Sequence, residues 1–223
     1  ILDYKLHFDF LLPFFKDSRY LKIDNMPVFQ IYRPESIPDI HFFLGLFSRL
    51  AKENELAGLY FLAVRTSQEW NQLDSGFNGF VFDNFSKINI YIKKSFSSFF
   101  HRLIWNNPII RKSLKLPKTI HYSTIRKCLE DFPDKSQIDF FPLAQVNWDN
   151  SPRAKELGTV YLGESPVAFK EHLKACIERA DKNSFQKKIV FIRSWNEWAE
   201  GNYLEPDQEF GLGYLKVVKE LIS

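Results

Sequence analysis

Glu197 and Glu200 are the residues of this sequence whose types and spacing best suit chemistry. They lie three positions apart, directly after an apolar segment, and Trp195 and Trp198 flank them. If this segment turns helically, both carboxylates lie on one face with Cβ atoms roughly 5–6 Å apart. Their charges then repel, so one carboxyl group can hold a proton while the other stays ionised. Chemistry at a glycosidic bond uses this division, with an acid for the leaving oxygen and an anion on the sugar side.

A purely structural role explains the same spacing equally well. The carboxylates could cap a helix and pair with Arg193 or Lys187, while the tryptophans fill the mouth of a barrel. In the catalytic interpretation the indoles exclude water and offer flat faces on which sugar rings stack. Trp195, Asn196 and Trp198 are then substrate-binding neighbours of the two carboxylates. The spacing alone leaves both interpretations open.

Short apolar and β-branched segments alternate with helical or turn-rich segments along the chain. This rhythm is typical of repeated βα units and predicts an α/β fold with a parallel sheet. The predicted strands cover 27–33, 56–65, 77–83, 140–148 and 189–195. The predicted helices cover 40–54, 165–180 and 212–221. Because the exits of parallel strands meet at one edge of a sheet, polar residues at these exits are expected to share one site.

Polar side chains follow each predicted strand. The further candidate substrate-binding residues are Tyr32, Arg33, Asp83, Asp149 and Asn150, and the cluster 65–70 and Asn84 occupy similar positions. Asp149 could accept hydrogen bonds from sugar hydroxyls, or it could cap the next segment. Arg33 could hold a phosphate or a carboxylate in two hydrogen bonds, or it could pair with Glu35 or Asp39.

The number of strands favours an incomplete barrel. A TIM-type (β/α) barrel typically needs roughly 250 residues and eight strands, whereas this chain of 223 residues offers only the five above. We therefore expect residues 1–223 to form a single domain, the C-terminal part of such a barrel, with the N-terminal strands missing. The chain starts at Ile1 and its only methionine is Met26, which agrees with a missing start. An open flavodoxin-like sheet would use as many strands, but no glycine-rich phosphate loop follows the first of them.

The composition limits other classes of protein. Hydrophobic residues make up 45% and aromatic residues 17% of the chain, enough for a sizeable core, and the rings could also serve as platforms for sugars. Cys128 and Cys176 form no CxxC motif and the five histidines are scattered, so we expect no metal and no cofactor. The sparse cysteines suit a reducing cytosol, and no apolar run reaches the roughly 18 residues of a membrane span. A cytoplasmic protein is expected.

Residues 87–128 form a basic insertion in this pattern. They include ten lysines and arginines and no acidic residue, whereas the whole chain carries a net charge of +3. An apolar stripe at helical spacing accompanies the charges, formed by Phe96, Phe99, Phe100, Leu103 and Ile104. We expect a barrel helix with a solvated basic face or, alternatively, peripheral contact with the anionic inner membrane. No recognised nucleic-acid-binding motif accompanies the charge, so nucleic acid is not an expected partner.

The run Ser194-Trp195-Asn196-Glu197-Trp198-Ala199-Glu200-Gly201-Asn202-Tyr203-Leu204-Glu205-Pro206-Asp207 resembles the C-terminal signature of the WbsX family of glycosyltransferases, associated with bacterial surface polysaccharide synthesis. Supporting matches are residues 27–29 with 31–34, Ile37-Pro38, and residues 148–153. The resemblance covers nearly the whole chain and begins partway into the family's usual length. It implies a glycan-active enzyme of lipopolysaccharide, O-antigen or capsular polysaccharide synthesis, with an oligosaccharide or lipid-linked saccharide as its partner.

The same run is similar to glycoside hydrolase family 99, the endo-α-mannosidases and mannanases, in which an Asn-Glu-Trp-His-Glu-Gly run carries both catalytic carboxylates. This likeness implies a glycosidase-like barrel in which Glu197 deprotonates or orients the sugar 2-hydroxyl. It makes Glu200 the general acid and base of a retaining reaction. Ala199 stands where the hydrolases have histidine, which removes a contact to substrate. A retaining site performs hydrolysis or transfer, depending on whether water or a sugar hydroxyl accepts.

A non-catalytic carbohydrate-binding or scaffold protein is the alternative function. In that case the truncated barrel keeps aromatic platforms but lacks a complete active site. A truncated barrel also exposes strand edges, which can pair with a second copy, so a homodimer is a further expectation.

Overall fold

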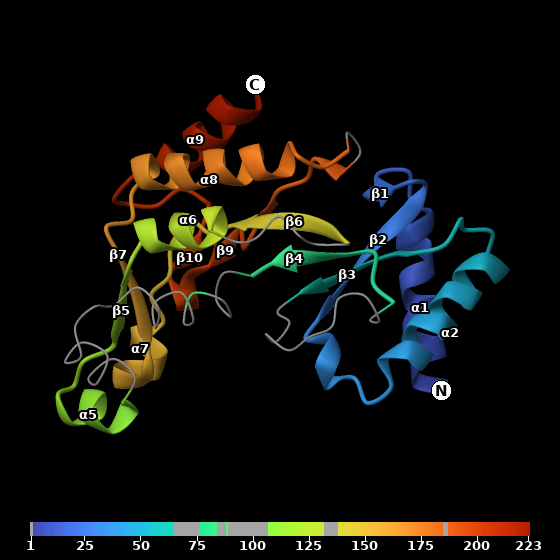
Figure 1. The fold of residues 1–223 in the computed structure, drawn as a ribbon, viewed down its shortest axis with the longest axis horizontal. Coiled ribbons are helices and arrows are strands. Elements are labelled where there is room, and N and C mark those ends of the chain that lie inside the picture. Colours follow the sequence, from blue (N-terminus) through green and yellow to red (C-terminus); the bar gives the residue numbers. More distant parts are fainter. Residues whose placement is uncertain (1, 65–75, 84–87, 89–106, 132–137, 185–186) are drawn as a thin grey trace. The chain divides into compact units, whose positions relative to one another are not determined.

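The computed structural model describes residues 2–64, 76–83, 88, 107–131, 138–184 and 187–223. The chain divides into two compact units, and Figure 1 labels most of their helices and strands. The first unit comprises Ile1–Asp83, Pro133–Phe141 and Asn183–Ile189, and the second comprises Asn84–Phe132, Pro142–Lys182 and Val190–Ser223. The single domain expected from the sequence stays a prediction.

A mainly parallel sheet runs through the first unit. Its strands are hydrogen-bonded in the order β1 (Lys22–Ile23), β2 (Met26–Tyr32), β3 (Tyr60–Val64), β4 (Gly79–Phe82) and β6 (Asp139–Ala144), of which β6 continues into the second unit. β2 pairs with β3 in parallel, and β3 pairs with β4 in the same way. β1 pairs antiparallel with β2 across Asp24 and Asn25, whose φ values of 51° and 64° suit a two-residue hairpin turn.

Phenylalanines pack the helices of the first unit against its sheet. The helices are α1 (Leu2–Lys16) and α2 (Ile40–Glu53), and η1 (Pro34–Ser36) leads from β2 to α2. The side chain of Asp39 caps α2 by accepting a hydrogen bond from Phe42 N at 2.9 Å. The Phe29 ring of β2 stacks on Phe47 of α2 at 5.6 Å between centroids and meets Phe15 of α1 at 5.9 Å. Part of the aromatic content that suggested ligand platforms is therefore used in packing.

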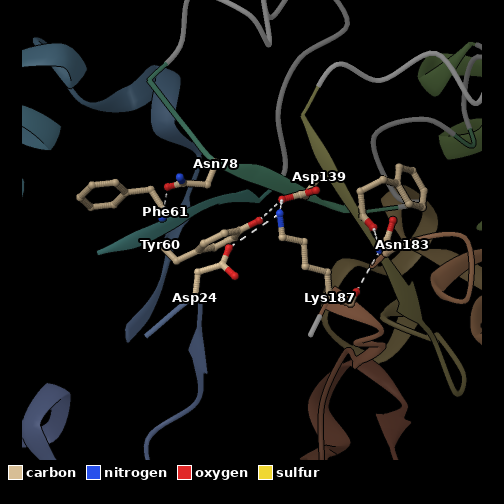
Figure 2. A network of polar contacts seen from close by, with 8 residues as sticks. Asp24, Tyr60, Phe61, Asn78, Asp139, Asn183 and Lys187 are labelled. Atoms are coloured by element: carbon tan, nitrogen blue, oxygen red, sulfur yellow. Dashed lines mark hydrogen bonds and ion pairs between the residues drawn. The ribbon is translucent and has the colours of Figure 1, made fainter. Parts of the chain in front are cut away.

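A polar network joins the beginnings of β3 and β6 to the turn before β2 (Figure 2). The Tyr60 hydroxyl donates to the Asp139 carboxylate, which also accepts from Lys187 at 2.7 Å. Lys187 Nζ lies 4.0 Å from the Asp24 carboxylate, and Asn183 Nδ2 donates to the Lys187 carbonyl at 3.0 Å. Burial first, and then the bond to Asp139, raises the pKa of Tyr60 well above its usual value, so the hydroxyl stays a donor. In barrels this N-terminal end of the strands serves stability rather than catalysis.

Replacing Lys187 by methionine is expected to lower the free energy of unfolding by about 1–2 kcal/mol and to leave any glycan turnover unchanged. Methionine keeps the apolar stem but removes one of the donors to Asp139, and a hydrogen bond to a charged group contributes about 1.5–3 kcal/mol. The two side chains are 23% and 28% exposed, so screening by water reduces the loss. Urea unfolding measures the effect against Lys174→Met, which alters an exposed lysine on another helix. Equal midpoints for the two variants would contradict the prediction.

The described part of the second unit contains the end of β6 and most of the described helices. Its elements are α5 (Pro108–Ser113), β5 (Lys118–His121), α6 (Ser123–Glu130), α7 (Ser151–Ala154), η2 (Lys155–Leu157), β7 (Thr159–Leu162), α8 (Pro166–Ala180), β8 (Phe191–Ile192), β9 (Asn196–Glu197), η4 (Trp198–Glu200), β10 (Asn202–Tyr203) and α9 (Gly213–Ile222). The end of β6 pairs in parallel with β8, so that Leu143 lies opposite Phe191. β5 and β7 form a two-stranded parallel sheet, and β9 and β10 form an antiparallel pair.

Helices α8 and α9 pack side by side in this unit (Figure 1). Phe169 of α8 meets Tyr214 of α9 edge to face, with 5.7 Å between ring centroids. Pro166 occupies the first turn of α8, and the Ser165 hydroxyl accepts from Ala168 N at 3.1 Å. The cap and the first-turn proline predicted for this helix are thus confirmed.

His172 of α8 is a fully buried histidine. Its exposed fraction is 0%, and burial lowers the pKa of the imidazole from 6.5 to about 4. The Tyr122 ring lies edge-on to it at 6.0 Å, and Cys176 Sγ lies 3.9 Å from Nε2. Between pH 6.5 and about 4 the unfolded chain therefore binds a proton that the folded protein excludes. The contribution of His172 to stability is present above pH 6.5 and is lost as the pH falls through this window.

Replacing His172 by glutamine is expected to flatten the fall in unfolding free energy between neutral and acid pH. A shift of one pKa unit corresponds to about 1.4 kcal/mol, so the variant should lose about 3 kcal/mol less than the wild type across the window. Unfolding by urea at a series of pH values measures this difference, and His121→Gln, at an exposed histidine, is the matched control. Parallel pH profiles for the wild type and His172→Gln would overturn the assignment.

All five predicted strands are present, as β2, β3, β4, β6 and β8. β8 is the most shortened, because the chain turns after Ile192 into the hairpin of β9 and β10. The described part of the basic insertion, 107–128, forms α5, β5 and most of α6 rather than one helix. The apolar stripe at 96–104, the cluster 65–70 and Asn84 lie outside the described residues.

The α/β class predicted from the sequence is confirmed, whereas a complete barrel is not shown. Among the helices that the structure describes, none is long and apolar enough to cross a bilayer. Cytoplasmic localisation and a homodimer stay predictions.

Candidate functional site

A short hairpin carries Glu197 and Glu200. β9 and β10 pair antiparallel, with Asn202 opposite Glu197, and η4 connects them. Gly201 closes the turn in the left-handed region, at φ 58° and ψ 22°, a conformation that glycine adopts without steric cost. The helix considered from the sequence is a single 3-10 turn, which Glu197 precedes and Glu200 ends. Both carboxylates therefore belong to one hairpin.

Glu200 is the partly buried member of the pair. Its side chain is 22% exposed, and its carboxylate forms an ion pair with the guanidinium of Arg153 on α7. The Glu200 carbonyl oxygen accepts from Asp149 N at 2.8 Å. A Cβ added to Gly201 would lie 2.9 Å from the same Asp149 nitrogen, so the two backbones touch. This contact fixes Glu200 on the loop that follows Trp148.

The partner of Glu200 differs from those considered in the structural interpretation. Arg153 takes that place, whereas Lys187 binds Asp139 in the first unit. The guanidinium of Arg193 lies over the Trp148 ring, 5.0 Å from its centre. Glu197 is exposed, so one carboxylate is held by a cation and the other is open to solvent.

Two half-exposed tryptophans accompany the carboxylates. Trp195 is 53% and Trp198 is 51% exposed, so neither indole is buried. The Trp198 ring stacks on Tyr203 with 3.8 Å between centroids and 14° between planes. Its Nε1 donates to the Glu205 carboxylate at 2.5 Å. The indole is thus held from two sides while half of its surface stays open, which makes it a preformed stacking platform.

An open depression of about 560 Å³ adjoins this platform. Among the described residues, it is lined by Trp198, Tyr203, Pro206, Asp207, Gln208 and Glu209. Ligand sites commonly measure roughly 300–1,000 Å³. Burial, followed by the nearby Asp207 and Glu209 carboxylates, raises the pKa of Tyr203, so its hydroxyl stays protonated. An aromatic wall beside carboxylates and an amide suits a hydroxyl-rich ligand such as a sugar.

Asp149 and Asn150 organise the loop that holds Arg153. Asp149 Oδ1 accepts from the N–H and the hydroxyl of Ser151 at 2.8 and 2.6 Å, which forms a turn directly before α7; the N-cap residue of α7 is Asn150. Asn150 Oδ1 accepts from Thr159 N at 2.7 Å and so ties the loop to β7. Both residues position the partner of Glu200. Contact between either residue and a sugar stays a prediction.

Tyr32, Arg33 and Asp83 lie in the first unit, at the ends of β2 and β4. Tyr32 is 55% exposed, whereas Asp83 is buried. Arg33 has a left-handed φ of 53°, and its guanidinium lies 5.6 Å from the centre of the Tyr32 ring. Asp39, a partner considered for Arg33, caps α2. That these three residues share a site with Glu200 stays a prediction.

Arg153 and Tyr203 are two residues of this site that their sequence context alone did not indicate. Both lie inside the motifs at 148–153 and 194–207. The one local signal for the contact between Trp198 and Tyr203 is Gly201, which lies between them and allows the chain to reverse direction. Nothing in the local sequence indicates the pairing of Arg153 with a residue 47 positions away.

The geometry alone defines a class of protein: an α/β fold with a hairpin that carries two carboxylates beside an aromatic platform. A solved structure described as a glycoside hydrolase-like protein has the same fold, with a TM-score of 0.61. The two are 13% identical in sequence, and the match covers 97% of this chain and 59% of that chain. The fold is therefore glycosidase-like.

The family follows from the sequence. Residues 2–218 match the family Glycosyltransferase WbsX, so the chain belongs to that family. Two relatives, each named Uncharacterized protein WxcX, come from two strains of Xanthomonas campestris pv. campestris. Each is 24% identical over 211 residues, which are 94% of this chain and 29% of the relative. The chain thus spans less than a third of the length of these relatives.

Proposed function

We propose that the chain supplies the carboxylate-bearing part of an enzyme that acts on glycosidic bonds. Its substrate is an oligosaccharide or lipid-linked saccharide in the synthesis or remodelling of bacterial lipopolysaccharide, O-antigen or capsule. Membership of the WbsX family and the glycosidase-like fold support a glycan-active enzyme. The relatives themselves are uncharacterized and longer, so the pathway rests on the resemblance of residues 194–207.

The observation that carries this proposal is the position of Glu200. Its side chain is partly buried, its backbone carbonyl accepts a hydrogen bond from Asp149 N, and it lies two residues after the half-exposed Trp198. A group that transfers protons must be held within hydrogen-bonding reach of the leaving oxygen. The backbone contact supplies that rigidity, and the Trp198 depression supplies a place for the neighbouring sugar.

In the proposed first step Glu200 protonates the glycosidic oxygen as its bond to the anomeric carbon breaks. Glu197 takes the proton of the 2-hydroxyl, whose oxygen bonds to the anomeric carbon in place of the leaving group, the role that the likeness to the family 99 hydrolases implies. In the second step Glu200 removes a proton from the incoming water or sugar hydroxyl, which bonds to the anomeric carbon as the bond to O2 breaks, and Glu197 returns its proton to O2. In the observed arrangement the Glu200 carboxylate is ion-paired, so proton donation requires it to leave Arg153. The arginine side chain is 62% exposed and can swing away when a saccharide enters.

Mass spectrometry of lipid-linked and free surface polysaccharide tests the proposed function. The protein, its Glu200→Gln form and a control form, Glu171→Gln, are incubated with each polysaccharide, with and without nucleotide sugars. Glu171 is an exposed carboxylate on α8 that pairs with Arg126. Shortened or rearranged chains with the wild type and the control, but not with Glu200→Gln, are expected. If the polysaccharide chains are extended only when a nucleotide sugar is present, and to the same extent by all three proteins, Glu200 has no part in the mechanism.

A further inference from the structure

Four large apolar side chains are exposed at one end of the second unit. Ile109 on α5 is 78% exposed, and Leu114 and Leu116 in the loop that follows are 52% and 50% exposed. Leu157 on η2 is 61% exposed, and η2 packs against α5. These four residues are called the α5 surface here. Single exposed leucines are common on proteins, but a group of them on adjoining elements marks an interaction site.

The segments that carry the α5 surface are held in place. Asn107 Oδ1 accepts from Ile109 N at 3.0 Å and so caps α5. Arg111 Nη1 donates to the Glu156 carbonyl at 3.2 Å, which joins α5 to η2. Leu116 N donates to the Arg111 carbonyl at 3.0 Å. The apolar groups are therefore presented in a fixed arrangement before any partner binds.

Positive charge surrounds these apolar groups. Lys112 and Lys115 alternate with the exposed leucines, and Lys155 is next to Glu156 on η2; all three lysines are exposed. Residues 107–128 contain no acidic residue. The side chain of Glu156 offsets one charge, so the α5 surface and its rim stay net positive.

We propose that the α5 surface binds the face of an anionic lipid bilayer. Apolar side chains enter the interface between headgroups and acyl chains, while lysines beside them contact lipid phosphates. A nucleic acid would match the charge but would leave four apolar side chains against a polar backbone. A protein interface would match the apolar groups, but interface cores are depleted in lysine. The combination of both features fits the lipid surface best.

This inference goes beyond the proposed function, because lipid binding needs neither Glu197 nor Glu200. It would place the enzyme at the surface where lipid-linked saccharides are found. Each lysine near an anionic bilayer contributes about a fivefold increase in partitioning at low salt. The contribution shrinks as salt screens the charges.

Vesicle flotation tests the α5 surface. The probes are vesicles of equal parts phosphatidylethanolamine and phosphatidylglycerol, and vesicles of phosphatidylcholine alone, each at low and high salt. One variant carries Lys112→Gln and Lys115→Gln, and a second carries Ile109→Ser and Leu116→Ser. The matched controls are Lys52→Gln with Lys216→Gln, and Val167→Ser with Leu212→Ser, which alter comparably exposed residues elsewhere. Circular dichroism confirms that every variant is folded.

The expected result is binding to anionic vesicles at low salt that falls at least about tenfold in each of the two surface variants and stays unchanged in both controls. Glu200→Gln should float with the vesicles like the wild type. No binding of the wild type at low salt, or equal losses in surface and control variants, would overturn the proposal. Retention on duplex DNA but not on vesicles, with the same dependence on Lys112 and Lys115, would overturn it in favour of nucleic acid.

Discussion

Replacing Glu200 by glutamine is expected to lower turnover of a saccharide substrate by about a hundred- to ten-thousand-fold, the usual contribution of general acid–base catalysis. Glutamine keeps the shape of the side chain and can still accept a hydrogen bond from Arg153, but it cannot donate a proton to the leaving oxygen. The loss should appear in kcat, because the sugar platform around Trp198 is not altered.

A comparison of two substrates with different leaving groups distinguishes a catalytic role of Glu200 from a positioning role. An aryl glycoside with an acidic phenol as leaving group needs little help from a proton donor. The first step, which releases the leaving group, should therefore be slowed much less by Glu200→Gln with the aryl glycoside than with a disaccharide. If both substrates slow by the same factor, Glu200 shapes the site without donating the proton.

Replacing Gly201 by alanine is expected to lower activity by about a hundredfold and the free energy of unfolding by about 2 kcal/mol or more. The φ of 58° costs an alanine about 1–2 kcal/mol. Its Cβ would also lie 2.9 Å from Asp149 N and 3.2 Å from Asp149 Cβ. The hairpin must then move away from the Asp149 loop, and a shift of about 1 Å can cost about a hundredfold in rate.

Gly211 provides the matched control for stability. Its φ is 56°, and an added Cβ would meet nothing within 4 Å. Gly211→Ala therefore isolates the backbone strain, and the additional loss in Gly201→Ala reports the collision with Asp149. Thermal and urea unfolding of both variants measure the difference. Equal losses would mean that the hairpin and the loop are not in the close contact described above.

The parallel strands and the carboxylate pair could be predicted because their signals are local. Short apolar runs that end in polar clusters specify β2, β3, β4, β6 and β8 without reference to distant residues. Helix α1 gave no such signal. Its apolar residues point both inward, as Phe8 and Phe15 do, and outward, as Leu6 and Phe10 do, and Pro13 lies inside it.

The contacts that define the site depend on distant segments. Arg153 reaches Glu200 because Asp149 accepts a hydrogen bond from Ser151, the first residue of α7, and donates its own N–H to the Glu200 carbonyl. The stacking of Trp198 on Tyr203 requires Gly201 to reverse the chain. Sequence spacing could place Glu197 and Glu200 in one short segment, but it could not show that Arg153 is the cation that pairs with Glu200.

The most direct test of the central claim measures turnover and saccharide binding on the same preparation of Glu200→Gln. Binding is followed by isothermal calorimetry with the same saccharide that is used in the turnover assay. The account predicts that turnover is lost while the dissociation constant stays close to that of the wild type. Unchanged turnover would contradict it, and binding without any turnover by the wild type would make the protein a carbohydrate-binding module instead of an enzyme.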